Sequence, residues 1–506
     1  MKVLVANRGE IAVRIMRACR EMRLPTVGVY SPSDRLAPHV RYADQAVALD
    51  ADHPTESYLR IDKLIDAARR TGADTVHPGY GFLAENAEFA RACRDAGLRW
   101  VGPTADVIAL MGGKTAARQA AQQAGVPVVP GTESPLADKL SDTEVNAVAA
   151  QIGYPLFVKA VAGGGGKGMR LVHDPVDLFG AIRSARSEAQ SAFGNSEVYL
   201  ERCVAVARHI EIQLLADEHG SVVPFVEREC SIQRRHQKVI EETPSSAVNA
   251  ETRQALAAAA AALAKGVAYT GAGTVEFLLD DGGQFYFLEM NTRLQVEHPI
   301  TEMVTGVDLV RWQLRIAAGE RLSLDAAEML VPKGHAIECR IYAEDPAAGF
   351  IPSPGQITSL RAAAGPGIRD DSGVDTGFEV PMHYDSMISK LVAWGTDRAQ
   401  AIDRMARALT EYEVCGVKTT IPFFRWMLQH PDFVAGRFDT RFLDRLLESG
   451  EDVSFIDMPR DAAEVAVIAT AVRTFLGQGA SPAAAPAGDS VRRAWRQAAR
   501  LEGVRS

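Results

Sequence analysis

The 506-residue sequence lacks several features that mark other classes of protein. Its six cysteines are scattered and form no C-x-x-C pair, so we expect neither a structural zinc site nor a disulfide framework. No apolar run approaches the length of a membrane span, and the first residues enter a strand pattern without a signal-peptide core. A formal net charge of −9 argues against general nucleic-acid binding. We therefore expect a soluble cytoplasmic protein that binds neither membranes nor nucleic acids.

Two common nucleotide-binding fingerprints are also missing. The first turn, Asn7–Glu10, has only one glycine, so the dinucleotide pattern G-x-G-x-x-G is absent and we do not predict NAD binding. The glycine run 163–166 lies between two strand-like segments, whereas a Walker loop opens a helix and reads G-x-x-x-x-G-K-[ST]. A flap of this kind can close its backbone N–H groups over phosphate oxygens. A flexible linker fits the glycines equally well, but Lys159 before them and Glu201 after the next helix favour the flap.

The N-terminal part alternates between strand-like and helical segments. The strand-like segments are Lys2–Ala6, Thr26–Tyr30 and Asp74–His77, and helical spacing fills Ile11–Met22 and Tyr58–Arg70 between them. Strands that alternate with helices predict a parallel α/β layer.

A hairpin is predicted near the middle of the chain. Strand-like segments Thr274–Leu279 and Phe285–Met290 flank an Asp-Asp-Gly-Gly turn. With Gly282 and Gly283 as a two-residue loop, counting back places Glu276 opposite Glu289. Two ionised carboxylates about 5 Å apart repel by about 3 kcal/mol at an effective dielectric of about 20. Because a divalent cation removes that repulsion, the pair predicts a magnesium site beside a nucleotide.

Period-2 alternation extends this polar face beyond the hairpin. Asn291 and Arg293 fall on the same side as Glu289, and Gln295 and Glu297 follow if the strand continues. A solvated strand face is the alternative, but an acidic residue opposite Glu289 disfavours it. We interpret the stretch as an active-site strand.

A second charged segment, Glu229–Glu242, contains Arg234, Arg235, His236 and Lys238. A solvated loop is one interpretation, but four cationic or titratable groups in five positions of an acidic chain favour an anion pocket. Further on, Gly334–Ala343 is predicted as a strand that carries alternating Glu338 and Arg340.

Together these residues resemble a known family, the biotin carboxylase component of biotin-dependent carboxylases, which belongs to the ATP-grasp superfamily. The resemblance covers about residues 1–447 and lies in the segments ANRGEIAVRIMRA, HPGYGFLAEN, RHIEIQ, ERECSIQRRHQKVIEE, FLEMNTRLQVEHPITEM and YDSMISKL. It implies an α/β and α+β multidomain fold. The implied parts are an N-terminal Rossmann-like parallel-sheet domain (1–113), an ATP-grasp domain (114–334) with a mobile glycine-rich lid (about 131–203), a C-terminal mixed-sheet domain (335–447) and a helical extension (448–506).

The resemblance also implies a reaction and its site. ATP and bicarbonate would form carboxyphosphate, whose CO2 passes to the ureido N1 of biotin. The residues implied to bind ATP are Lys114, Lys159, Gly163, Gly164, Gly165, Gly166, Met169, Glu201, Arg202, Val204, His209, Gln233, His236 and Leu278. Those implied to position Mg²⁺ (or Mn²⁺) are Glu276, Glu289 and Asn291. Those implied to bind bicarbonate or biotin are Lys238, Arg293, Gln295, Val296, Glu297 and Arg340, with Glu297 as the base and Arg340 stabilising the biotin enolate; Lys238 and Arg293 are counted as catalytic.

No A-M-K-M-like biotin attachment motif occurs in the sequence. We therefore expect biotin to arrive on a separate carrier protein and the carboxyltransferase to be a different polypeptide. The resemblance further implies a homodimer. Acetyl-CoA carboxylase is the expected holoenzyme, with a propionyl-CoA, other acyl-CoA or pyruvate carboxylase as the alternative. The competing interpretations are a carbamoyl-phosphate-type synthetase and a non-catalytic ATP-binding subunit.

The last segment, Val491–Leu501, is predicted to be a basic helix after a Pro/Ala/Gly-rich linker. We hypothesise that it docks a partner protein of the holoenzyme, although a tail packed on its own domain is equally compatible. Deleting residues 478–506 is then expected to weaken holoenzyme assembly while carboxylation of free biotin persists. Pull-down and activity assays test this, and loss of both properties would contradict it.

Overall fold

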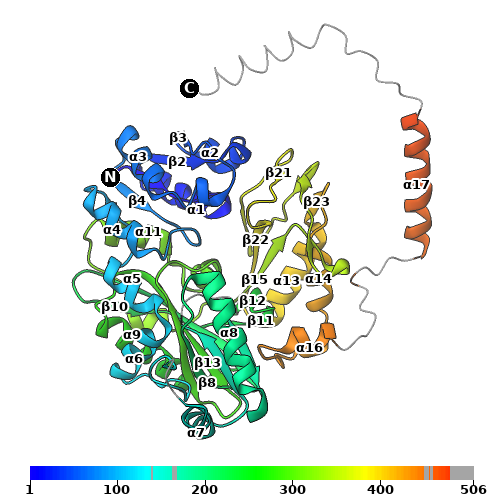
Figure 1. Cartoon of the computed structure of the whole chain (residues 1–506). Helices are drawn as coiled ribbons and strands as arrows, with labels where there is room; N and C mark the ends of the chain where they lie inside the picture. Colours follow the sequence, from blue (N-terminus) through cyan, green and yellow to red (C-terminus); the bar gives the residue numbers. More distant parts are fainter. Residues whose placement is uncertain (138–140, 162–167, 449–454, 456–459, 479–506) are drawn as a thin grey trace. The chain divides into compact units, whose positions relative to one another are not determined.

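The computed structural model describes residues 1–137, 141–161, 168–448, 455 and 460–478. The chain divides into two units, Met1–Val453 and Ser454–Ser506 (Figure 1). In the second unit the structure describes α17 (Arg460–Gln478), in a region that is rich in alanine. The glycine run Gly163–Gly166 and the predicted terminal helix Val491–Leu501 lie outside the described residues.

The N-terminal segment forms the predicted parallel α/β layer. Its five strands are all parallel, in the order β3-β2-β1-β4-β5. They are β1 (Val3–Val5), β2 (Thr26–Tyr30), β3 (Gln45–Ala48), β4 (Thr75–His77) and β5 (Arg99–Trp100). The helices of this segment are α1 (Gly9–Glu21), α2 (Pro38–Tyr42), α3 (Ile61–Thr71) and α4 (Ala87–Asp95), followed by α5 (Ala105–Gly112) and α6 (Lys114–Gln123). Strands β1 and β2 are almost wholly buried, as continuous apolar strands of a parallel sheet are.

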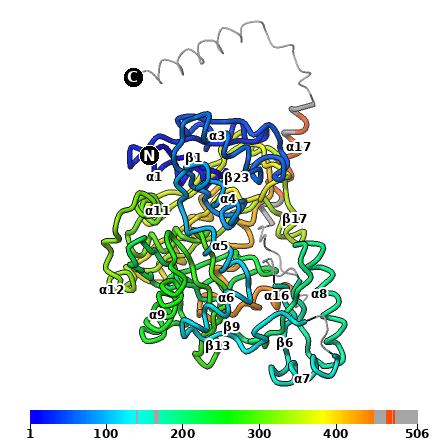
Figure 2. Tube along the Cα trace, turned by 60° about the vertical axis from the view of Figure 1, so that its left-hand side comes forward, coloured from blue at the N-terminus to red at the C-terminus, as the bar shows by residue number. Residues whose placement is uncertain are grey.

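A small antiparallel sheet follows, in the order β7-β6-β8. Its strands are β6 (Leu156–Ala160), β7 (Met169–Val172) and β8 (Val198–Arg202), and its helices are α7 (Asp142–Ile152) and α8 (Leu178–Phe193). Helix α8 packs against β6 and α7 against β8, and Figure 2 shows both helices beside this sheet. Lys159 pairs with Met169, so the strand-like segments predicted before and after residues 163–166 are neighbouring strands of this sheet.

A nine-stranded antiparallel sheet forms the platform of the site. Its order is β14-β13-β9-β11-β12-β15-β22-β20, with β10 paired to β9. The strands are β9 (Ala207–Ala216), β10 (Val222–Pro224), β11 (Arg228–Arg234), β12 (Gln237–Thr243), β13 (Gly271–Asp280), β14 (Phe285–Asn291), β15 (His335–Tyr342), β20 (Ile368–Ser372) and β22 (Met387–Gly395). Because β12 pairs with β15, segments far apart in the sequence share one sheet.

Helices and short strands complete this part of the chain. The helices are α9 (Ala250–Gly266), α10 (His298–Thr305), α11 (Leu309–Ala317), α12 (Ala326–Met329), α13 (Arg398–Glu411), α14 (Ile421–Met427), α15 (Pro431–Val434) and α16 (Phe442–Glu448). The short strands are β16 (Glu344–Asp345), β17 (Ile351–Pro352), β18 (Gly355–Gln356), β19 (Ser359–Arg361), β21 (Glu379–Val380) and β23 (Glu413–Cys415). No helix of the described residues is both long and apolar enough to cross a membrane.

Candidate active site

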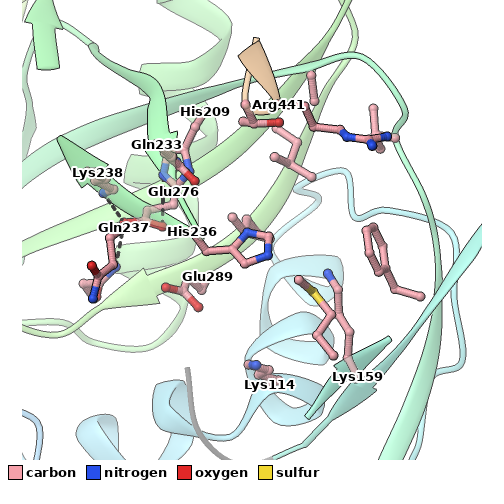
Figure 3. A pocket seen from close by; sticks show the side chains of 18 of the residues that line it. Lys114, Lys159, His209, Gln233, His236, Gln237, Lys238, Glu276, Glu289 and Arg441 are labelled. Atoms are coloured by element: carbon pink, nitrogen blue, oxygen red, sulfur yellow. Dashed lines mark hydrogen bonds and ion pairs between the residues drawn. The ribbon is translucent and has the colours of Figure 1, made fainter. Parts of the chain in front are cut away.

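A cavity of about 700 Å³ opens between the small sheet and the nine-stranded sheet. Figure 3 shows Lys114, Lys159, His236 and Glu289 around one space in it. The predicted site residues that line it are Lys114, Lys159, Met169, Glu201, Arg202, Val204, His209, Gln233, His236, Lys238, Glu276, Leu278, Glu289, Asn291, Arg293, Gln295, Val296 and Arg340. Glu297 lies behind this lining and is fully buried.

The central hairpin places Glu276 opposite Glu289, as predicted, but by a different route. The N–H of Asp280 donates to the carbonyl of Gln284 at 2.9 Å, so the loop has three residues rather than two. Phe277 pairs with Phe287, and the register then shifts by one before Glu276 pairs with Glu289. A β-bulge at Leu288 therefore compensates for the longer loop.

The two hairpin carboxylates differ in their electrostatic surroundings. Burial alone would raise the pKa of Glu276, but the charges of Lys238 and His209 hold it far below its usual range. Burial and repulsion from Glu276 raise the pKa of Glu289, and Lys114 opposes that rise. A charge at Glu289 is thus disfavoured unless a further cation arrives. Two carboxylates with the amide of Asn291 form a set of hard oxygen donors that fits Mg²⁺.

The extended face ends sooner than predicted. Strand β14 stops at Asn291, and Glu297 is the N-cap of α10, so the prediction of a continuing strand is wrong. The side chains still converge on the hairpin. Gln295 Nε2 donates to Glu276 Oε1 at 3.0 Å, and Arg293 Nη1 donates to Gln295 Oε1 at 3.0 Å. The turn after Asn291 therefore brings Arg293 and Gln295 toward Glu276, as the extended strand was expected to do.

Arg293 is fixed from the N-terminal segment. Its Nε donates to Glu85 Oε2 at 2.9 Å, and the other oxygen of Glu85 accepts from the backbone N–H of Thr292 at 2.9 Å. Sequence reasoning missed Glu85, although it lies within HPGYGFLAEN, one of the segments that carry the resemblance.

Lys238 lies at the centre of the charged cluster. Its Nζ lies 2.6 Å from Glu211 Oε2 and 2.7 Å from both Glu276 Oε1 and Glu297 Oε1. Burial would lower its pKa, but the three carboxylates raise the pKa well above the usual lysine value. The charged segment predicted as an anion pocket forms the β11–β12 hairpin. In this hairpin the Lys238 side chain points toward the three carboxylates. Glu211 was not predicted, although it lies within RHIEIQ, another of the segments that carry the resemblance.

Glu297 is an ionised carboxylate held between two cations. Its Oε1 accepts from Lys238 and its Oε2 accepts from Arg340 Nη2 at 3.1 Å. Burial would raise its pKa, but Lys238 and Arg340 lower it well below the usual range. Arg340 forms its ion pairs with Glu241, at 2.5 Å, and with Glu297, rather than with Glu338, its neighbour two positions away on β15.

The other end of the cavity has a mixed apolar and polar lining. Lys159 and Arg118 both pair with the buried carboxylate of Glu201. Gln233 and His209 are hydrogen-bonded at 3.0 Å. The lining residues that sequence reasoning did not assign include Phe157, Tyr199, Asp385, Arg441 and Asp444, which come from four separate parts of the chain.

Three protein-family profiles cover most of the chain. Those described as "Biotin carboxylase, N-terminal domain" and "Biotin carboxylase C-terminal domain" match residues 1–108 and 338–445. The profile described as "Carbamoyl-phosphate synthase L chain, ATP binding domain" matches residues 113–325 between them. The chain belongs to the biotin carboxylase family.

Known biotin carboxylases resemble this one along most of their length. The Nostoc protein named "Biotin carboxylase" is 51% identical over 447 residues, which is 88% of this chain and 99% of the relative. A pyruvate carboxylase subunit of Methanothermobacter thermautotrophicus is 51% identical over 443 residues, 88% of this chain and 89% of the relative. The Campylobacter jejuni biotin carboxylase structure has a TM-score of 0.85 at 44% identity and covers 88% of this chain and 98% of that one. The biotin carboxylase domain of Hydrogenobacter thermophilus 2-oxoglutarate carboxylase has a TM-score of 0.85 at 45% identity, with the same coverage.

These findings confirm the expected fold class and the expected kind of enzyme. This biotin carboxylase combines an N-terminal parallel sheet with an antiparallel ATP-grasp sheet and a C-terminal α/β part. It is an ATP-dependent carboxylase of the ligase class.

Proposed function

We propose that this biotin carboxylase performs the first half-reaction of acetyl-CoA carboxylase, the ATP- and bicarbonate-dependent carboxylation of biotin on a separate carrier protein. The observation that carries the chemistry is Glu297, a buried ionised carboxylate behind the cavity lining, held between Lys238 and Arg340, which both line the cavity. A role in pyruvate carboxylase is the second candidate, since the Methanothermobacter relative is as similar as the Nostoc one.

The nucleotide end of the cavity supplies positive charge for phosphates. The positive charge comes from Lys114 on α6 and Lys159 on β6. Burial lowers the pKa of His236, in the turn of the β11–β12 hairpin, so its imidazole is a neutral N–H donor toward the same space. Phosphoryl transfer needs charges placed around the transferred group rather than a covalent protein intermediate. Magnesium bound by Glu276, Glu289 and Asn291 would supply Lewis-acid charge to the phosphate oxygens.

Glu297 is suited to removing the bicarbonate proton. It is ionised, and Arg293, Gln295 and Val296 precede it on the turn that faces the cavity. The deprotonated bicarbonate oxygen attacks the γ-phosphorus of ATP, and ADP leaves. The carboxyphosphate so formed divides into CO2 and phosphate. The geometric requirement is a carboxylate within hydrogen-bond reach of the bicarbonate hydroxyl.

Arg340 is suited to the second step. When the ureido N1 of biotin passes its proton to the phosphate released from carboxyphosphate, negative charge develops on the ureido oxygen, and N1 then forms a bond to the carbon of CO2. A fixed guanidinium in a largely buried position stabilises that charge. Arg340 is 9% exposed and is held by Glu241 and Glu297, so little reorganisation is required.

Replacing Glu289 with Gln is expected to raise the Mg²⁺ concentration for half-maximal activity by about tenfold. The change removes one hard ligand charge while keeping the side-chain shape, and tenfold corresponds to about 1.4 kcal/mol. Activity titrated with MgCl2 at a fixed total ATP concentration measures this. The exposed acid Glu328 gives a matched control, and an unchanged Mg²⁺ requirement in Glu289→Gln would exclude this glutamate as a ligand.

The proposed function predicts bicarbonate-dependent ATP hydrolysis that free biotin stimulates. Purified chain is assayed for ADP release with and without bicarbonate and biotin. A carbamoyl-phosphate-type enzyme would instead respond to ammonia, and a non-catalytic ATP-binding subunit would bind ATP without cleaving it. Pairing the chain with each candidate carrier and carboxyltransferase then distinguishes acetyl-CoA, other acyl-CoA and pyruvate as acceptors.

The proposal extends to partners and location. We propose that the biotin carrier protein and the carboxyltransferase are separate polypeptides; the chain covers 99% of a Nostoc relative that is named for biotin carboxylase alone, which supports this. We also propose a cytoplasmic homodimer; the related Hydrogenobacter biotin carboxylase domain is described as a dimer, which supports the oligomeric part. Sedimentation of the purified chain tests that part.

A further inference from the structure

Two glutamates face each other inside the nine-stranded sheet. Glu241 of β12 is the cross-strand partner of Glu338 of β15, and both are 0% exposed. Side chains of directly opposed residues project from the same face of a sheet, with Cβ atoms about 5 Å apart. Glu338 has no role in the reaction described above, and Glu241 enters it only as an ion-pair partner of Arg340.

The carboxyl groups of this pair are short of partners. Within the part of the chain that the structure describes, neither oxygen of Glu338 has a hydrogen-bond partner, and Glu241 has only the contact of its Oε1 with Arg340. Arg340 Nη2 contacts Glu241 Oε1 at 2.5 Å, but the same nitrogen also donates to Glu297 Oε2 at 3.1 Å. One guanidinium therefore serves two carboxylates and leaves Glu338 without a counter-charge.

The other charged groups nearby do not neutralise Glu338. From β22, Lys390 is fully buried, but its Nζ donates to the Val296 carbonyl at 3.0 Å and pairs with Glu10 of α1 at 3.3 Å. The titratable and charged groups around the pair, from β12, β15, β22, α1 and the start of α10, are Lys238, Glu241, Arg340, Lys390, Glu10, Glu297 and His298.

A buried carboxylate without a counter-charge takes up a proton rather than remain ionised. Burial and then the charge of Glu241 raise the pKa of Glu338 well above the usual value, against the lowering effect of Lys390 and Arg340. Glu241 is the member of the pair that contacts a cation, so the proton belongs on Glu338. A protonated carboxyl group is a hydrogen-bond donor, and a carboxylate is its strongest acceptor.

We propose that Glu338 carries a proton, that it donates this proton in a hydrogen bond to the Glu241 carboxylate, and that this acid–carboxylate pair positions the Arg340 guanidinium beside Glu297. The claim that the pair positions Arg340 rests on the proposed role of Arg340 in stabilising the biotin enolate. A second negative charge on Glu338 would draw the guanidinium toward the pair and away from Glu297. Glu338 is thus a positioning residue that acts through Glu241.

Infrared difference spectroscopy tests the proton directly. The spectrum of the wild-type chain minus that of Glu338→Gln, both at neutral pH, is expected to contain the C=O stretch of a protonated carboxyl group, which shifts in D2O. A difference spectrum with only carboxylate bands would overturn the proposal. The measurement needs no turnover, so an inactive wild-type chain would contradict the proposed function and leave this result intact.

Kinetics tests the positioning. Glu338→Gln keeps the shape and an N–H donor, and we expect its kcat for biotin carboxylation within about twofold of wild type. Glu338→Leu removes the donor, and we expect kcat to fall about tenfold with the KM for ATP unchanged, since the nucleotide residues lie elsewhere in the cavity. Equal losses in both variants, or a loss that appears only in the KM for ATP, would overturn the positioning role.

The pH profile gives a third readout. Above the pKa of Glu338, the wild-type chain gains a second buried negative charge beside Arg340, so kcat is expected to fall on the alkaline side. In Glu338→Gln no proton can leave at this position, and activity is expected to persist to higher pH. An alkaline limb that is identical in the two proteins would contradict the assignment of the proton to Glu338.

Discussion

A Glu297→Gln variant is expected to lose biotin carboxylation by a factor of about 10² to 10⁴, the range that positioned acid–base groups contribute. The amide keeps the shape of the side chain but cannot accept the bicarbonate proton. ATP affinity is expected to change little, because Glu297 lies behind the cavity lining and not among the residues near Lys159. Bicarbonate-dependent ADP release and a nucleotide-binding titration together measure the two effects.

The control for this variant is Glu328→Gln, which changes an exposed glutamate on α12. It is expected to match the wild type in both measurements. A Glu297→Gln protein that retains more than about a tenth of the wild-type rate would show that another group accepts the proton. The nearby Cys230 thiol does not suit that role, because burial raises its pKa well above the usual value and keeps it neutral.

Local patterns in the sequence predicted which residues face each other in the central hairpin, but not the length of its loop or the bulge in its second strand. The facing pair Glu276 and Glu289 followed from counting along a hairpin, and the structure has that pair. The count assumed a two-residue loop, and a bulge at Leu288 offset the extra loop residue. A bulge leaves no signature in alternation of apolar and polar residues, since it depends on how a strand packs against its neighbour.

Long-range contacts were beyond the reach of sequence patterns. Glu211 and Glu85 each fix a predicted cation, Lys238 and Arg293, from strands or loops far away in the chain. The order of strands in the sheet determines which carboxylate lies beside a buried cation. Lys238 is on β12 and Glu211 is on β9, and the two strands are separated in the sheet only by β11. A lone acidic residue on an ordinary strand gives no local sign of that partnership.

Several of the predicted nucleotide-binding residues came from the family resemblance alone and not from residue patterns or spacing. Nothing in the local sequence of Val204, Leu278 or Met169 suggests a nucleotide site, yet all three line the cavity. Their roles toward ATP remain predictions, while their common location is a property of the fold. For residues Thr292–Glu297 the local pattern was informative but its structural interpretation was wrong. Alternation predicted residues that do lie at the site, but it placed them on an extended strand, whereas β14 ends at Asn291 and Glu297 is the N-cap of α10.

Replacing Lys238 with Met is expected to abolish activity and to lower the free energy of unfolding by about 3–5 kcal/mol at neutral pH, the usual result of breaking a buried charge cluster from one side. Three carboxylates, those of Glu211, Glu276 and Glu297, lose the cation they share. Thermal or urea unfolding of the ligand-free chain measures the change. The exposed Lys265→Met on α9 is the matched control and is expected to unfold like the wild type.

The pH dependence of this loss has a definite sign. In the wild type, the pKa values of Glu276 and Glu297 lie below those of an unfolded chain, so their contribution to stability is present above about pH 4.3 and is lost as the pH falls through the folded pKa values. Without Lys238, burial and mutual repulsion are expected to raise these pKa values above the unfolded value. The folded variant then binds more protons than the unfolded chain, and its stability declines as pH rises. The deficit of Lys238→Met relative to wild type is therefore expected to be smaller at pH 5 than at pH 8, and a deficit independent of pH would show that Lys238 does not hold these carboxylates in their ionised form.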